Sequence, residues 1–124
     1  MIKVKRVYEP HATADGARFL VERLWPRGIA KAALQMDGWL KEAAPSMELR
    51  RWFNHDPERW MEFKRRYVAE LEAHPDAWKP ILAKAHRGCV TLLYSAHEIE
   101  NNNATVLRDF LNRKLKTERK RQDR

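Results

Sequence analysis

Strand-like segments that alternate with helical segments constrain the fold of this chain more than any other feature. Residues 2–8, IKVKRVY, alternate apolar and basic side chains, which is the period-2 pattern of a strand with one buried face. Residues 18–25, RFLVERLW, are more continuously apolar and meet Pro26, which predicts a buried strand that ends in a rigid turn. A short third strand is expected around Trp39. The clearest strand is residues 89–96, CVTLLYSA, in which β-branched and aromatic residues follow a helix-ending glycine.

The helical segments between these strands have readable ends. Ser46 is expected to cap one helix, and Asp56 to cap a second that has Pro57 at its first position. In a third helix Pro80 must either kink the helix or delay its start, and a last helix begins at about Asn102. We interpret the apolar stripes of these helices, aromatic members included, as core. The stripes consist of Leu49, Trp52, Phe53, Trp60, Phe63, Tyr67, Leu71, Trp78, Ile81, Leu82, Ala85, Leu107, Phe110 and Leu111.

This alternation predicts the fold class. Strands that are separated by helices pair in parallel, because each return to the sheet requires a crossover connection. The sequence therefore predicts an α/β fold, with a small, mostly parallel β-sheet flanked by helices in a single domain. A chain of 124 residues is long enough to bury a core of its own. We expect this domain to span residues 1–112.

The basic charge is concentrated at one end of the chain. The formal net charge is +8, and residues 113–124, RKLKTERKRQDR, contain seven basic and two acidic residues, so they supply +5 and leave +3 to residues 1–112. Clustered charge at a terminus is typical of a solvated, frayed end. We therefore expect residues 113–124 to form a disordered basic tail.

Composition and patterning exclude several classes of protein. No window has the roughly 18 consecutive apolar residues of a membrane-spanning helix. The first residues lack the apolar region and cleavage site of a secretion signal, so we expect a cytoplasmic protein with no membrane partner. Cys89 is the single cysteine, so no internal disulfide can form, and no Cys/His cluster predicts a metal site. We expect no cofactor.

The candidate site follows from the predicted sheet. In open α/β sheets, ligands bind beyond the carboxyl ends of the strands, where helix N-termini present free N–H groups. Arginine presents a planar fork of charged donors, and two or three such forks match a phosphate or a carboxylate. Trp25 and Pro26 would stiffen the turn that carries two of these arginines. The candidate ligand-binding residues are Arg6, Arg23, Arg27, Tyr94, Glu98 and Asn102.

The two arginines of the turn also have a structural interpretation. Arg23 can pair with Glu22, Glu98 or a backbone carbonyl, and Arg27 can simply lie in solvent. Arginines that lack enough carboxylates to neutralise them repel each other, so an anion between them would relieve the repulsion. Both interpretations stay open at this point.

The polar loop after the last strand has alternatives of the same kind. His97 and Glu98 could act as an acid/base pair, although neighbouring residues on a loop can point apart. The asparagines at 101–103 are well suited to cap the last helix. His55, next to Asp56, is expected at a helix boundary rather than in a catalytic role.

Several stretches together resemble the YeaO-like proteins, the small bacterial members of the domain of unknown function 488 (DUF488) family. The stretches are RLWPRG, KEAAPS, LRRWFNHDPERWMEFKRRYVAEL and VTLLYSAHEIENNNA, and the resemblance runs from Lys5 to about Leu111. It implies an α/β fold and no particular reaction. The residues that it marks as important are Arg6, Arg23, Trp25, Pro26, Arg27, Gly28, Lys41, Pro45, Ser46, Trp52, Phe53, His55, Asp56, Tyr94 and Asn102.

The chain departs from the pattern of this family in the loop after the last strand. Glu98 stands where relatives commonly have Asp, and Asn101 and Asn103 stand where histidines often flank the matched asparagine. Larger relatives carry a Cys-His-Arg-like run in this region, and this chain has none. The resemblance therefore does not predict a thiol or histidine mechanism here.

Two functions from different classes follow from these observations. The first is a small enzyme or binding protein whose arginine-lined pocket takes an anionic metabolite. The second is a nucleic-acid-associated module that uses the basic tail together with Arg6 and nearby lysines, since contacts to backbone phosphates give affinity without sequence preference. The chain has no recognised DNA-reading motif, which favours the first function. Whether it is an enzyme, and its oligomeric state, stay open.

Overall fold

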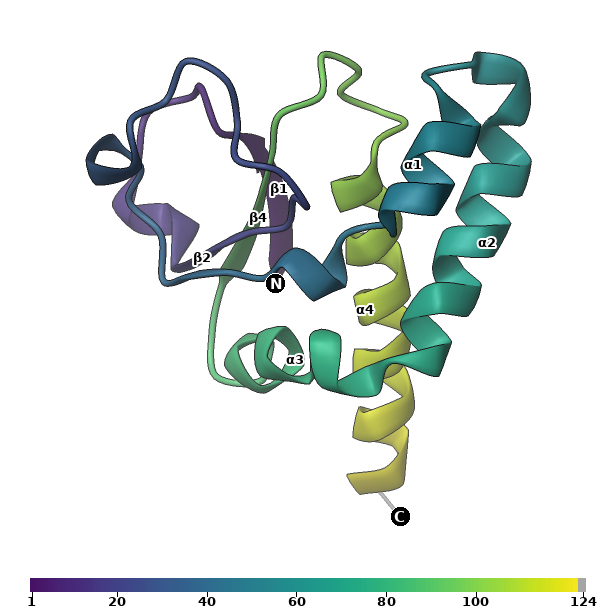
Figure 1. The fold of residues 1–124 in the computed structure, drawn as a ribbon. Coiled ribbons are helices and arrows are strands. Elements are labelled where there is room, and N and C mark those ends of the chain that lie inside the picture. Colours follow the sequence, from purple (N-terminus) through teal and green to yellow (C-terminus); the bar gives the residue numbers. More distant parts are fainter. Residues whose placement is uncertain (123–124) are drawn as a thin grey trace.

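The structure, a computed structural model, describes residues 1–122. Its four strands are β1 (Ile2–Arg6), β2 (Ala17–Leu20), β3 (Gly38–Trp39) and β4 (Val90–Tyr94), and they form one sheet in the order β1-β4-β2-β3. Every pairing in the sheet is parallel. The α-helices are α1 (Met47–Phe53), α2 (Trp60–Ala73), α3 (Lys79–Ala85) and α4 (Asn103–Gln122). This arrangement confirms the predicted α/β fold and the single domain (Figure 1).

The second strand ends earlier than the sequence predicted. β2 stops at Leu20, although the Val21 amide still donates to the carbonyl of Leu93 (3.1 Å). From Glu22 the chain turns away from the sheet, and the carbonyl of Glu22 accepts from the indole N–H of Trp39 (2.6 Å) instead of a strand neighbour. The apolar residues at 24–25 therefore belong to a covering loop rather than to the strand.

The two faces of the sheet have different covers. In β4, Val90, Leu92 and Tyr94 face the large core that the helices complete, whereas Leu93 belongs to a smaller apolar cluster on the opposite face. Figure 1 shows the four α-helices on one side of the strands and the long loop before β3, residues 21–37, on the other. We call these the helix face and the loop face.

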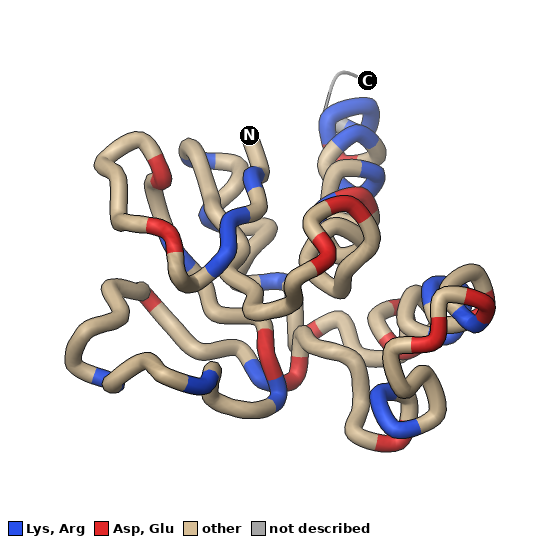
Figure 2. The backbone as a smooth tube through the Cα atoms, turned by 90° about the horizontal axis from the view of Figure 1, so that it is seen from above, with Lys and Arg blue, Asp and Glu red and all other residues tan. Residues whose placement is uncertain are grey.

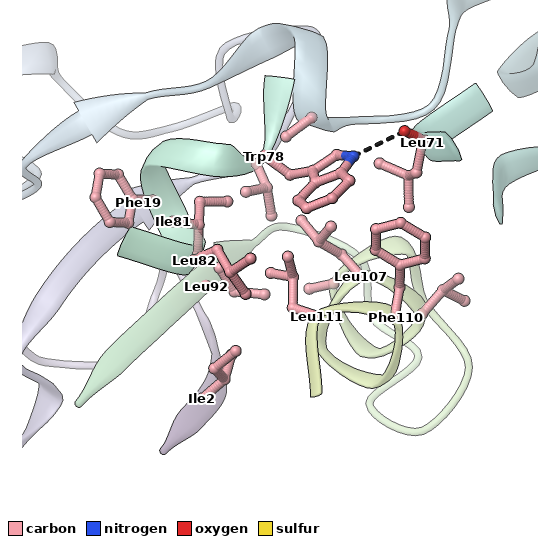
Figure 3. Close-up of a cluster of buried hydrophobic side chains, with 14 of the residues drawn as sticks. Ile2, Phe19, Leu71, Trp78, Ile81, Leu82, Leu92, Leu107, Phe110 and Leu111 are labelled. Carbon is pink, nitrogen blue, oxygen red and sulfur yellow. Dashed lines mark hydrogen bonds between the residues drawn. The ribbon is translucent and has the colours of Figure 1, made fainter. Parts of the chain in front are cut away.

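The large core fills the helix face (Figure 3). Trp78 meets Phe110 of α4 edge to face, with ring centroids 5.0 Å apart, and its indole N–H donates to the carbonyl of Leu71 (2.7 Å). Tyr67 is fully buried, and its hydroxyl donates to the carbonyl of Ala43. The predicted stripe of α2 is confirmed at Phe63, Tyr67 and Leu71, while Trp60 is half-buried and packs against the core from its rim.

The helix starts confirm the predicted caps. The Ser46 hydroxyl accepts from the backbone N–H of Leu49 (3.1 Å) at the start of α1. Asp56 accepts from the N–H of Glu58 (3.0 Å) and begins a single 3₁₀ turn, Pro57–Arg59, that leads into α2. Between these helices Asn54 and His55 have positive φ values of 47° and 54°, so His55 lies at a helix boundary as expected. Pro80 occupies the first turn of α3, where its missing N–H costs no helical hydrogen bond.

The C-terminal segment differs from the prediction. We expected a disordered tail over residues 113–124, but α4 continues to Gln122 without a break. Leu115 reaches the core from this extension, and the Lys114 ammonium donates to Glu72 of α2 (3.1 Å). These contacts hold the helix against the domain beyond the predicted boundary. Residues 123–124 of the predicted tail lie outside the described part of the chain.

No helix within residues 1–122 is long and apolar enough to cross a membrane.

Candidate functional site

Arg6 lies at the carboxyl end of the edge strand β1, where it pairs with Tyr94 of β4. Its guanidinium donates from Nε to the carbonyl of Ala96 (3.0 Å) and from Nη2 to the carbonyl of Ser95 (3.4 Å). The same group stacks on the ring of Tyr8, 4.8 Å from the centroid. Among the described residues nothing accepts a hydrogen bond from Nη1. The Arg6 guanidinium is therefore held in place, and its Nη1 remains available to donate to a ligand.

Arg27 reaches the same end of the sheet from the long loop. The hydroxyl of Tyr8 donates to the carbonyl of Arg27 (3.0 Å), which ties this loop to the strand end that carries Arg6. The turn is stiffened by the Trp25 indole, which donates to the carbonyl of Ile29 (2.6 Å), and by Gly28, whose φ of +78° suits glycine. The Arg27 side chain is exposed and has no hydrogen-bond partner within residues 1–122. Tyr8 thus contacts the guanidinium of Arg6 with its ring and the backbone of Arg27 with its hydroxyl.

Tyr94 is buried beside Arg6. Burial raises the pKa of its hydroxyl, the carboxylates of Glu9 and Glu98 add to this rise, and the charge of Arg6 opposes it. Glu9 and Glu98 lie close enough to Tyr94 for their charges to act on its hydroxyl. The strand end therefore contains acidic as well as basic groups.

Asn102 caps α4. Its side-chain oxygen accepts from the backbone N–H of Thr105 (3.0 Å), while the Thr105 hydroxyl oxygen accepts from the N–H of Asn102 (3.2 Å). The amide nitrogen of Asn102 donates to the carbonyl of Glu98 (2.9 Å) and closes the preceding loop. Its buried polar atoms are engaged within the protein, as the capping interpretation predicted.

His97 and Glu98 do not form an acid/base pair within the described residues. Both side chains are exposed, and Oε1 of Glu98 accepts from the backbone N–H of Glu100 (2.9 Å), which is a local loop contact. Among residues 1–122, no group of three or more His, Cys, Asp or Glu side chains is arranged to hold a metal ion.

Arg23 belongs to a different network from the other predicted site residues. Its Nε and Nη2 donate to the carbonyls of Pro45 (3.1 Å) and Ala44 (3.4 Å), and Nη1 pairs with Glu42 (3.0 Å). All three nitrogens therefore have protein partners, which matches the structural interpretation of this arginine.

Arg23 also lines a groove of about 390 Å³ between the segment before α1 and the end of α2. Three carboxylates, Glu42, Glu70 and Asp76, share this groove with it, so the charge of the groove does not favour an anion.

Glu22 is a polar residue of this region that sequence reasoning used only as a possible partner of Arg23. Its side chain is buried, and Oε1 accepts from both the amide (2.8 Å) and the hydroxyl (3.0 Å) of Ser95. Burial raises the pKa of Glu22, against the hydrogen bonds from Ser95 and the charge of Arg50. The signal that could have found it is a carboxylate inside the apolar run RFLVERLW, at the point where the strand ends.

Comparisons with known proteins place the chain among related bacterial sequences. A family model described as the inactive DUF488-N3 subclade matches residues 1–124. The uncharacterized protein YeaO of Escherichia coli is 46% identical over 110 residues, which cover 89% of this chain and 96% of that protein. Uncharacterized proteins of Mycobacterium bovis and Mycobacterium tuberculosis are each 42% identical over 112 residues, covering 90% of this chain and 93% of theirs. No solved structure shows significant similarity to the chain.

Proposed function

Because the chain belongs to the YeaO-like DUF488 family, in a subclade described as inactive, we propose that it is a binding protein for a small anionic molecule rather than an enzyme. The anion, a phosphate or carboxylate group, binds at the strand end between Arg6 and Arg27. One observation carries this proposal: Tyr8 joins the two arginines, with its ring on the guanidinium of Arg6 (4.8 Å) and its hydroxyl on the carbonyl of Arg27 (3.0 Å).

The hydrogen bonds of the two side chains support an anion at this place. Nε and Nη2 of Arg6 are held by carbonyls, which carry no formal charge, and the Glu9 carboxylate accepts from the backbone N–H of Arg6 (2.8 Å) rather than from its guanidinium. The guanidinium of Arg6 is therefore oriented without an ion pair among the described residues. The guanidinium of Arg27 is held by nothing within the described residues. A bound anion would accept hydrogen bonds from both groups and reduce the repulsion between them. The nearby carboxylates of Glu9 and Glu98 oppose a highly charged ligand, which favours a small anion over a polyanion.

The first test is the response of thermal unfolding to inorganic phosphate and sulfate, with potassium chloride at equal ionic strength as the salt control. We expect phosphate to raise the melting temperature of the wild type, because a ligand that binds the folded state stabilises it. Arg27→Met is the cleanest variant, since the Arg27 side chain is exposed and has no hydrogen bond or ion pair within residues 1–122. This variant should weaken phosphate binding about tenfold, roughly 1.4 kcal/mol.

Arg87→Met is the matched control, because Arg87 is also exposed and lies after α3, just before β4 begins. It is therefore at the amino ends of the strands, opposite the end that carries Arg6. It should respond to phosphate as the wild type does. The proposal is contradicted if neither anion raises the melting temperature of the wild type more than chloride does. It is also contradicted if phosphate raises the melting temperature of Arg27→Met as much as that of the wild type.

A second candidate function is supported by the extended α4. Arg113, Lys116 and Lys120 recur at the spacing of one helix face, and all three are exposed. None of them forms an ion pair within residues 1–122, where the ion pairs of this helix involve Arg108, Lys114 and Glu118. Lys and Arg gather along the last turns of α4 in Figure 2. Such a face could contact the phosphates of a nucleic acid.

The test of this second function is the salt dependence of binding to a short DNA duplex. Replacing the three side chains together by Gln should lower the affinity and reduce the slope of log affinity against log salt by about two to three units, one for each lost phosphate contact. Lys31→Gln, which removes an exposed lysine from the long loop, is the control. An unchanged slope in the triple variant would exclude this face as a nucleic-acid surface.

A further inference from the structure

The loop face of the sheet holds a cluster of buried charges that neither proposed function uses. Arg18 of β2 is 4% exposed at its side chain, and its Nη1 pairs with Asp15 at 2.5 Å. Lys5 of β1 pairs with the same carboxylate at 3.1 Å. Asp15 is 6% exposed and Lys5 is 19% exposed, so all three groups are largely removed from water.

Two cations therefore share one buried carboxylate. The carboxylate of Asp37 also lies near Arg18, but it is exposed and accepts from the backbone N–H of Arg18 (2.7 Å) rather than from the guanidinium, so the buried side chains alone carry one surplus positive charge. Burial alone would raise the pKa of Asp15, but hydrogen bonds from the Ala12 amide, Lys5 and Arg18 outweigh it and bring the pKa to about 2. Asp15 thus stays ionised and cannot supply a second negative charge. A surplus charge in a poorly solvated place is costly unless a counter-charge can reach it.

The Arg18 guanidinium has one nitrogen left for such a counter-charge. Nε donates to the carbonyl of Gln35 (2.7 Å) and Nη1 to Asp15, whereas Nη2 has no acceptor within residues 1–122. No buried side-chain nitrogen or oxygen in the described chain lacks a hydrogen-bond partner. Nη2 must therefore reach open space, and Arg18 lines a cavity of about 420 Å³.

The wall of this cavity is partly apolar and partly polar, with Tyr8, His11 and Gln35 among its polar residues. Val7, Ile29 and Leu34 line it, as do the side chains of Pro10 and Ala33. The exposed carboxylate of Glu9 lies on its wall and disfavours a second negative charge in the ligand. A cavity that combines the guanidinium of Arg18 with these apolar side chains suits a ligand that has one anionic end and a small apolar body.

We propose that this cavity binds a small apolar monocarboxylate, with the carboxylate at Nη2 of Arg18 and the apolar body against Val7, Ile29 and Leu34. The site is independent of the one between Arg6 and Arg27. The two sites share Tyr8 in their walls, but the cations that define them lie in different strands and loops.

Benzoate and its uncharged analogue benzamide test this proposal by titration of the ¹⁵N-labelled protein. We expect benzoate to shift the amide signals of Ile29 and Ala33, and benzamide to bind at least about tenfold more weakly. Ala33→Trp should abolish benzoate binding, because a large side chain would fill the cavity from an exposed position without touching the Arg18–Asp15 pair. Arg27→Met should leave benzoate binding unchanged.

Arg18→Lys tests the role of the charged donor. A lysine can still pair with Asp15 but lacks Nη2, so this variant should bind benzoate and benzamide equally weakly. If Arg18→Lys does not fold, Ala33→Trp and the benzamide comparison still decide the question. Equal binding of benzoate and benzamide to the wild type would overturn the proposal, as would benzoate binding that survives Ala33→Trp. Benzoate binding that is lost in Arg27→Met would assign the ligand to the strand-end site instead.

Discussion

Arg23 and Arg27 are four residues apart in the sequence, but their surroundings predict different effects of substitution. Arg23→Met removes the donors to two buried backbone carbonyls, those of Pro45 and Ala44. Hydrogen bonds from a charged donor contribute about 1.5–3 kcal/mol, and the pair with exposed Glu42 adds little. We expect Arg23→Met to lower the free energy of unfolding by roughly 1–3 kcal/mol, measured by urea denaturation.

Arg27→Met is the internal control of that experiment. The side chain of Arg27 is exposed, so its loss should change the free energy of unfolding by no more than about 0.5 kcal/mol in the absence of an anion. Equal stability of the two variants would show that the carbonyl contacts of Arg23 contribute nothing to the fold.

Glu22 should make the stability depend on pH. Burial raises its pKa above the ordinary 4.5, so at mildly acidic pH the folded chain binds more protons at this position than the unfolded chain. The wild type therefore gains stability as the pH falls through the folded pKa, and the gain is complete below the unfolded pKa. Gln at this position keeps the oxygen that accepts from Ser95 but cannot titrate.

The measurement is the difference in unfolding free energy between wild type and Glu22→Gln, followed from about pH 7 to about pH 5. We expect the free energy of unfolding of the wild type to rise relative to that of the variant as the pH falls. Glu48→Gln, at an exposed position of α1, provides the baseline. A difference that stays constant, or that moves the other way, would show that the pKa of Glu22 is not raised in the folded protein.

At individual residues, the sequence predicted local chemistry better than long-range partners. The capping role of Asn102 follows from its own neighbours in the chain, and the structure confirms it. Arg23 finds its partners at positions 42–45, which no pattern near residue 23 reveals. Whether Arg6 and Arg27 bind an anion stays a prediction.

Among the elements, helix starts were predictable because a cap is a contact between residues two or three apart. Ser46 and Asp56 therefore mark α1 and the turn before α2 correctly. The end of β2 was not predictable in the same way. Apolar residues continue past Leu20, but their surroundings differ. Val21 packs in the helix-face core, Leu24 is exposed, and Trp25 packs on the loop face, where it meets Trp39 with ring centroids 5.3 Å apart. A continuous apolar run in the sequence therefore does not show where the strand ends and the loop begins.

The end of α4 is a packed helix, although its many basic residues predicted a disordered tail. Seven basic residues suggested a frayed tail, but Leu115 is buried on the helix face, one turn beyond Leu111. A chain that ends at Asn112 loses this contact and should be less stable than the full chain by roughly 2–4 kcal/mol, the usual cost of removing a buried leucine. Urea denaturation measures the loss.

A chain that ends at Glu118 is the control for that truncation. It keeps Leu115, the pair of Lys114 with Glu72 and the contact of Glu118 with His86, and removes exposed basic residues. Its unfolding free energy should stay within about 1 kcal/mol of the full chain, since exposed charges contribute little. Similar destabilisation by both truncations would mean that helix length, and not Leu115, determines the loss.

For the whole molecule, the alternation of strands and helices was enough to predict a parallel sheet. It was not enough to predict the strand order, in which the last strand, β4, lies between β1 and β2. Every residue of β4 is buried, which fits this central position. A fully apolar segment is typical of any interior strand, so it does not predict which strands lie beside it. The placement of all four α-helices on one face of the sheet, with the long loop on the other, also follows from tertiary packing. The sequence of the long loop has no helical period that would predict its position over the sheet.

The unequal packing of the two faces predicts that the protein unfolds in two steps, with the loop face opening first. The loop face is anchored by a cluster of four buried residues, Val7, Leu20, Leu34 and Leu93, which is far smaller than the helix-face core. Amide exchange at Asp37 and Leu40, which bond to β2, should therefore proceed through a partial opening that costs less free energy than global unfolding. Amides of β4 should exchange by global unfolding alone.

Native-state hydrogen exchange at increasing, low urea concentrations checks this expectation. The amides of Asp37 and Leu40 should show a weak dependence on urea, because a partial opening exposes little surface, and the amide of Leu92 should show the full dependence. A common free energy and a common urea dependence for all three amides would mean that the loop and the core unfold as one unit.

The same division of the sheet bears on how this family can diversify. Substitutions on the helix face must preserve the packing of a large, interlocked core, so mutation there is strongly constrained. The long loop over the other face is anchored at few positions, and insertions or replacements between its anchors leave the core intact. A lineage can therefore change the recognition chemistry of one surface while the other side of the same sheet keeps the protein folded.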